Sequence, residues 1–182
     1  MTTALAPSSQ SFLRQVAYVD QPHLDDETTL VASYSKLGPV LFDVKQLGSL
    51  KRLERVETIV IDHNDIRELQ KVHTSLPRLT ELYLDWNALE SIDASNMLLR
   101  TLETLSLTSN RIKLIENAQG LNNLRPLLNA TGFQRLRVLK LSNNQLRNLE
   151  NIAVGSLCET LEVLIVAHNN LTHLSDMVRN IC

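Results

Sequence analysis

Apolar residues recur in a fixed frame of eleven positions along the second two-thirds of the chain. The frame is clearest at residues 79–89, LTELYLDWNAL, with leucine at positions one, four, six and eleven and asparagine at position nine. It returns as VETIVIDHNDI, LETLSLTSNRI, LRVLKLSNNQL and LEVLIVAHNNL, which begin at residues 56, 102, 136 and 161. Alternation around positions four and six is typical of a short strand with one buried face. Stacked repeats of this kind would form a parallel sheet over one continuous leucine core.

Position nine is an asparagine in all five frames: Asn64, Asn87, Asn110, Asn144 and Asn169. Asparagine tolerates unusual backbone angles, and its amide can bond main-chain groups of adjacent turns. We therefore interpret all five as structural. Three residues after each frame another apolar side chain is expected to line the return limb of the coil: Leu69, Ile92, Ile115, Leu149 and Leu174.

The five frames in register resemble the leucine-rich repeat superfamily over about residues 50–174. The resemblance implies a right-handed α/β solenoid with a short-stranded parallel sheet on its concave face. It also implies that the five asparagines form a ladder through the interior. The chain looks like the short intracellular members, such as the phosphatase-regulatory and dynein light-chain types, which serve as adaptors or regulatory subunits.

Four segments follow from these patterns. Residues 1–11 are small and polar and are predicted to be a disordered tail, residues 56–174 hold the five repeats, and residues 175–182 leave a short or truncated C-terminal cap. Residues 12–55 allow two interpretations. Frames beginning at Leu13 and Leu37 would be degenerate repeats without the asparagine, whereas Asp25 and Asp26 could cap a helix over residues 27–37.

Successive asparagines are 23, 23, 34 and 25 residues apart, so the third interval carries an insertion of about 11 residues. The insertion falls within residues 116–135, where leucines recur at helical spacing. We expect a longer convex helix there, with an extra docking element for a partner as the alternative.

Composition narrows the function class. A net charge of -2 and a pI near 6.2 give no general attraction to nucleic acid or to an anionic membrane. Only two cysteines occur in 182 residues, and we find neither a signal-peptide pattern nor 18 consecutive apolar residues. We therefore expect an intracellular protein, cytoplasmic or nuclear, with no membrane partner.

Positions three, five and seven should face away from the core, on the concave side, with position eight at its rim. In the first repeats this side carries an aromatic patch within acidic groups: Tyr83, Trp86, Asp62, Asp85 and Glu81. In the last two repeats it carries an apolar patch beside one lysine: Val138, Lys140, Val163 and Ile165. Trp86, the only tryptophan, is either a binding anchor or a cover over the edge of the core.

Nothing in these columns predicts an enzyme. No histidine or cysteine has a metal-ligand spacing, and no Gly-rich phosphate loop occurs, so we expect no cofactor. The chain is instead predicted to bind a protein helix or extended segment with an apolar core and some basic residues. Two alternatives stay open: a ribonucleoprotein component resembling the spliceosomal leucine-rich protein, which Lys140 alone hardly favours, and a structural fragment or homodimer.

Overall fold

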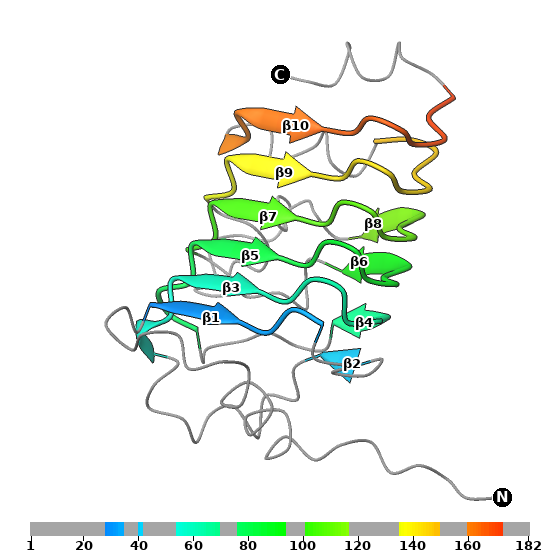
Figure 1. The fold of residues 1–182 in the computed structure, drawn as a ribbon. Helices are drawn as coiled ribbons and strands as arrows, with labels where there is room; N and C mark the ends of the chain where they lie inside the picture. Colours follow the sequence, from blue (N-terminus) through cyan, green and yellow to red (C-terminus); the bar gives the residue numbers. More distant parts are fainter. Residues whose placement is uncertain are drawn as a thin grey trace, which may run out of the picture.

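The computed structural model describes residues 28–34, 40–41, 54–69, 76–93, 101–116, 135–149 and 160–172. These residues coil into a solenoid of parallel strands, stacked one coil on the next (Figure 1). The main sheet has six strands in the order β1 (Thr29–Val31), β3 (Thr58–Val60), β5 (Glu81–Tyr83), β7 (Thr104–Ser106), β9 (Val138–Lys140) and β10 (Val163–Ile165).

Five of these strands occupy positions three to five of the five frames. Their register keeps each frame position level with the same position in the next coil, so that Leu82 lies opposite Ile59 on one side and Leu105 on the other. The predicted parallel stack of short strands is confirmed in this part of the chain. The side chains at position four therefore form one continuous row beneath the sheet.

The α/β class predicted for the fold is wrong, because the described residues form a parallel β-solenoid with almost no helix. The described parts of the return limbs, where the resemblance implies helices, are extended. Two small parallel sheets lie there, β2 (Val40–Leu41) with β4 (Glu68–Leu69), and β6 (Ser91–Asp93) with β8 (Leu114–Glu116).

The physical reason is the side-chain pattern of the limb. Ile92 and Ile115 are buried next to the exposed Ser91 and Leu114, which is the alternation of a strand and not the spacing of a helix. Both buried residues are β-branched, which favours extended backbone. The resemblance implies helices on these limbs, whereas the leucines at helical spacing that also predict one lie within residues 116–135, almost entirely outside the described part of the chain.

The N-terminal segment contributes a sixth coil that the sequence interpretation misplaced. Thr29–Val31 is a strand paired in parallel with β3, so the helix considered for residues 27–37 is wrong at these residues. The degenerate frame beginning at Leu37 is also shifted, because Val40 and Leu41 lie on the return limb against β4. The true frame begins at Glu27 and places Leu30 at position four and Ala32 at position six.

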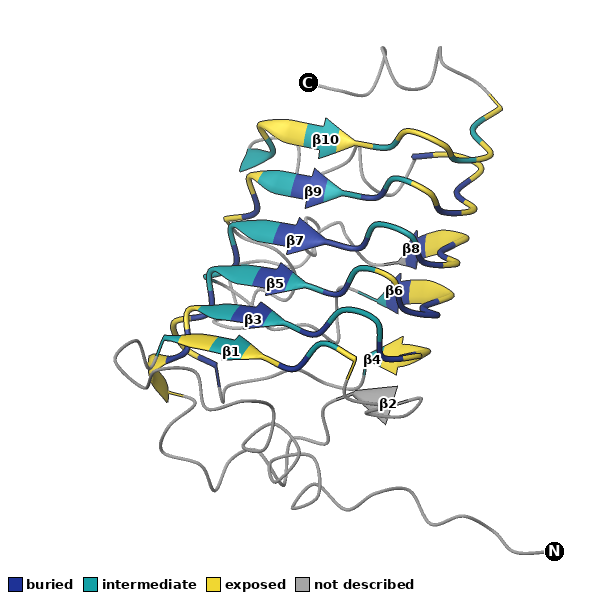
Figure 2. Cartoon of the chain, in the orientation of Figure 1, coloured by how far each residue is buried: buried dark blue, intermediate teal, exposed yellow. Residues whose placement is uncertain are grey.

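The core lies between the main sheet and the return limbs (Figure 2). In the central coils the side chains at positions four, six and eleven are almost completely buried, as Leu82, Leu84 and Leu89 show. In the end coil, Leu164 and Val166 are only partly buried. Burial thus decreases toward β10 within the described part of the solenoid.

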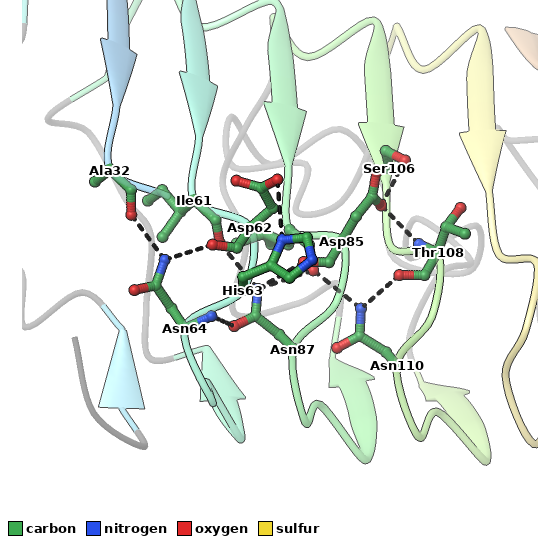
Figure 3. Close-up of polar contacts among 11 residues, drawn as sticks. Ala32, Ile61, Asp62, His63, Asn64, Asp85, Asn87, Ser106, Thr108 and Asn110 are labelled. Atoms are coloured by element: carbon green, nitrogen blue, oxygen red, sulfur yellow. Dashed lines mark hydrogen bonds and ion pairs between the residues drawn. The ribbon is translucent and has the colours of Figure 1, made fainter. Parts of the chain in front are cut away.

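The asparagines at position nine bond each coil to the one before it (Figure 3). Asn87 Nδ2 donates to the carbonyl of Ile61 at 2.9 Å, and its Oδ1 accepts from the backbone N–H of Asn64 and of Ile66 at 3.0 and 3.1 Å. The same bond to the preceding position-six carbonyl recurs in every frame. It is donated by Asn64, Asn110, Asn144 and Asn169 to Ala32, Leu84, Leu107 and Leu141.

Several expectations concern segments outside the described residues: the tail at 1–11, the degenerate frame beginning at Leu13, all but the ends of the insertion at 116–135, and the cap at 175–182 with Leu174. Within the described ranges, no helix is long and apolar enough to cross a membrane.

Candidate functional site

Two adjoining surfaces present side chains that the core does not use. The first, here called the sheet face, consists of the side chains at positions three and five of the main sheet, opposite the leucine row. The second, here called the rim, consists of the residues at position eight, just beyond the strands: Tyr34, His63, Trp86, Ser109, Asn143 and His168.

At the middle of the sheet face, Tyr83 lies in a polar cluster. Its hydroxyl donates a hydrogen bond to Glu81 Oε2 at 3.2 Å, and Thr58 Oγ1 approaches the same oxygen at 3.5 Å. On the other side, Lys140 Nζ lies 5.9 Å from the centre of the Tyr83 ring. This places a cation over an aromatic face, an attractive arrangement. Tyr83 therefore contacts the Glu81 carboxylate through its hydroxyl and the Lys140 ammonium group through its ring.

Burial raises the pKa of the Tyr83 hydroxyl above its usual value of 10.0, and the nearby carboxylates of Glu81 and Asp85 raise that pKa further. In the unfolded chain the hydroxyl loses its proton at a lower pH than in the native protein. The free energy of unfolding should therefore fall as the pH rises above 10.0 and through the native pKa.

We expect Glu81→Gln to bring the pKa of Tyr83 closer to 10.0, because the substitution removes the negative charge next to the hydroxyl. Alkaline titration followed by tyrosinate absorbance measures this pKa, and the Tyr83→Phe variant supplies the signal to subtract. An unchanged curve in Glu81→Gln would contradict the assignment of Glu81 as a cause of the shift.

At the far end of the sheet face, apolar residues replace the polar cluster. Val163 and Ile165 are exposed on β10, and Val138 lies beside Val163 on the neighbouring strand. Lys140 is level with Ile165, so it separates this patch from Tyr83. The two predicted halves of the surface thus share one lysine at their boundary.

Along the rim the backbone takes the same left-handed conformation in all six coils. The φ angles of these residues lie between 54° and 58°, a region that costs free energy for any residue other than glycine. The main chain is fixed there by bonds to the next coil, such as Trp86 N–H to the carbonyl of Thr108 at 2.9 Å. Because the turn is the same in every coil, the rim side chains leave the backbone at equivalent positions.

Three of the rim residues are aromatic and stack in a row, here called the ring stack: Tyr34, His63 and Trp86. The ring centres of Tyr34 and His63 are 4.2 Å apart with planes at 20°, and those of His63 and Trp86 are 5.5 Å apart at 12°. The outer two rings are exposed, Tyr34 by 70% and Trp86 by 59%. A column of three stacked rings therefore extends across three coils, and its two outermost rings are accessible to solvent.

Acidic side chains lie directly before the ring stack in the chain. His63 Nδ1 lies 3.2 Å from Asp62 Oδ2, while Oδ1 of Asp62 is buried and accepts no hydrogen bond from the described residues. Asp85 Oδ1 accepts from Ser106 Oγ at 2.6 Å and from the Thr108 N–H at 2.7 Å (Figure 3). The charge at this end of the surface is therefore negative.

The structure divides the predicted aromatic patch between the two surfaces. Tyr83 and Glu81 bond each other on the sheet face, whereas Trp86 belongs to the ring stack. Sequence reasoning missed Tyr34 and Val31, which are both exposed. A frame beginning at Glu27 would have identified both residues, because in it Tyr34 takes the position of Trp86 and Val31 takes the position of Tyr83.

The carboxylates and histidines of this region do not form a metal centre. Among the residues that the structure describes, no three potential metal ligands lie close enough to hold one ion. The pair of Asp62 and His63 could orient a proton. What the arrangement offers chemically is stacking, apolar contact and negative charge.

The repeated coil, the bonded asparagines and the uniform rim establish a repeat solenoid. Function must be inferred from the sheet face and the rim of that solenoid. The chain matches no protein-family model, and no curated protein matches it.

Proposed function

We propose that this chain is a leucine-rich repeat protein of the adaptor kind, which binds a protein partner through its sheet face and rim and catalyses no reaction. Five frames in register and the asparagine bonds between coils support the leucine-rich assignment. The described return limbs are extended in this protein. Two cysteines in the whole chain favour an intracellular location.

One observation carries the proposal. Six large apolar or aromatic residues are exposed in the described part of the chain, and five of them lie on the sheet face or rim: Val31, Tyr34, Trp86, Val163 and Ile165. The sixth, Leu114, lies on the return limb. Exposed apolar residues that gather on one side mark an interaction surface, whereas residues scattered singly do not.

The residue types suit a protein ligand. Tryptophan and tyrosine supply large contact areas with few rotatable bonds, which is why they dominate the binding energy of many interfaces. Val163 and Ile165 provide an apolar contact at the other end of the sheet. An extended or helical segment that crosses the strands would contact both ends.

Affinity capture from a lysate of the source organism tests this function. The full chain and a folded Tyr83→Ala/Trp86→Ala variant would be used side by side, with retained proteins and RNA identified for each. We expect the variant to lose a protein partner, because truncating an interface anchor weakens binding by about 2 kcal/mol or more.

A Leu114→Ala variant is the matched control, since it removes an exposed apolar side chain from the return limb. It should retain the partner. Circular dichroism of all variants excludes unfolding as the cause of a loss. Equal retention of every protein by both variants would contradict the proposed use of Tyr83 and Trp86, and retention of RNA alone would favour the ribonucleoprotein alternative.

A further inference from the structure

We propose that the outer face of Trp86 binds the guanidinium group of an arginine in the protein partner, as the next layer of the ring stack, and that Asp85 pairs with its charge. This inference rests on the proposed function and names the chemistry that its partner must bring.

The ring stack ends at Trp86 within the described residues. On one side the indole lies against His63, with ring centres 5.5 Å apart. On the other side the equivalent rim residue is Ser109, and after it Asn143, whose Nδ2 lies 3.4 Å from Ser109 Oγ. Neither residue has an aromatic ring, and the Trp86 side chain is exposed. A planar group of a ligand can therefore continue the stack over Ser109.

The charge beside this position selects a cation. Asp62 and Asp85 precede the rim residues of two adjacent coils, and Figure 3 shows both carboxylates on the strand side of the asparagine row. Asp62 Oδ1 is buried and has no hydrogen-bond partner among the described residues, so Asp62 acts on this position through its charge and not as an acceptor for the ligand. The phosphates of a nucleic acid would be repelled here, although a base could stack on Trp86.

Among cations, planarity favours arginine over lysine. The guanidinium group is flat and weakly hydrated, stacks on aromatic faces and presents five N–H donors to carboxylates. An ammonium group offers a more strongly hydrated point charge and cannot stack. Tryptophan is also the aromatic residue that attracts cations most strongly.

Because Trp86 is the only tryptophan, its fluorescence reports directly on this site. The probes are three blocked pentapeptides, Gly-Gly-Xaa-Gly-Gly, in which Xaa is arginine, lysine or citrulline, titrated into the full chain. Citrulline keeps the planar shape of arginine without its charge. We expect the arginine peptide to have a dissociation constant about tenfold below those of both others, since stacking and charge act together only in arginine.

Two variants retain Trp86 and test its surroundings. Ser109→Tyr places a ring where the guanidinium would lie, in a backbone conformation that Tyr34 and Trp86 already adopt, and should abolish the arginine response. Asp85→Asn keeps the oxygen that accepts from Ser106 and Thr108 but removes the charge, and should weaken arginine binding about tenfold. Glu68→Gln on β4 changes the net charge equally and should have no effect.

Equal affinities for arginine and lysine, or for arginine and citrulline, would overturn the assignment. So would an unaltered arginine response in Ser109→Tyr, or tighter binding of a single-stranded oligouridylate than of the arginine peptide. If any of these occurs while Tyr83→Ala/Trp86→Ala still loses a protein partner, the arginine site fails and the proposed function stands. If the double variant retains the same proteins as the native chain in the affinity capture, that result refutes the proposed function independently of the arginine site.

Discussion

Replacing Leu82 with alanine is expected to lower the free energy of unfolding by about 2–5 kcal/mol. Leu82 is completely buried on the middle strand β5, level with Ile59 and Leu105 of the neighbouring coils. Truncation removes apolar contacts on both sides and leaves a cavity, because the flanking strands are held in register by the sheet and cannot close in. Denaturant unfolding of the native chain and the variant measures the difference.

Leu164→Ala is the matched control, since it truncates the same frame position in the end coil. Leu164 is only partly buried, so its loss should cost less, because less apolar area is removed from water at this position on folding. Equal destabilisation by the two substitutions would contradict the decrease in burial toward β10. A change in the denaturant dependence of either variant would show that the coils no longer unfold together.

The second large effect is expected at Asn87. Its side chain bonds the carbonyls of Ile61 and Leu84, and it accepts from the N–H groups of Asn64 and Ile66. Alanine would remove the bonds to both N–H groups and to the carbonyl of Ile61, while the carbonyl of Leu84 keeps the bond that Asn110 donates. The cost should be near the top of the range of about 1–3 kcal/mol for an unsatisfied partner. The midpoint of thermal or denaturant unfolding measures the loss.

Asn169→Ala provides the comparison for that substitution. Asn169 makes similar bonds to Leu141 and Leu146, but it is only partly buried, so water can replace its amide. Its loss should cost less than that of Asn87. An unchanged melting temperature in Asn87→Ala would refute the structural role that we assign to the asparagine row.

The strands could be predicted because each frame repeats a local pattern. An apolar position four between polar neighbours, as Leu105 is between Thr104 and Ser106, specifies a strand. The repeat specifies that the strands lie side by side in parallel, as those of Leu82 and Leu105 do. The asparagine at position nine marked the turn after the strand. These features depend on residues within one coil and on their recurrence, both of which a sequence displays.

The return limbs could not be predicted in the same way, because their pairing depends on neighbouring coils. Ile92 on β6 pairs with Ile115 on β8 of the next coil, and the limb alone has too few apolar positions to distinguish strand from helix. The coil of β1 escaped detection because Glu27 stands where a leucine is usual and Ala32 fills position six.

The candidate surface was partly predictable. Residues at positions five and eight were identified in the five clear repeats, including Tyr83 and Trp86. The stacking of Trp86 on His63 and of His63 on Tyr34 could not be predicted. It depends on the left-handed turn at the rim and on the presence of a sixth coil. Neither was evident from composition or spacing.

The uniform left-handed turn of the rim also limits how this surface can change over generations. Proline is excluded there because its ring fixes a negative φ angle, and β-branched residues are disfavoured because they crowd the backbone. Serine, asparagine, histidine and the large aromatics are all accommodated, as the six coils demonstrate. The rim side chain of each coil can thus be substituted without changing any leucine of the core. Ligand preference and folding therefore depend on different positions of the repeat and can evolve separately.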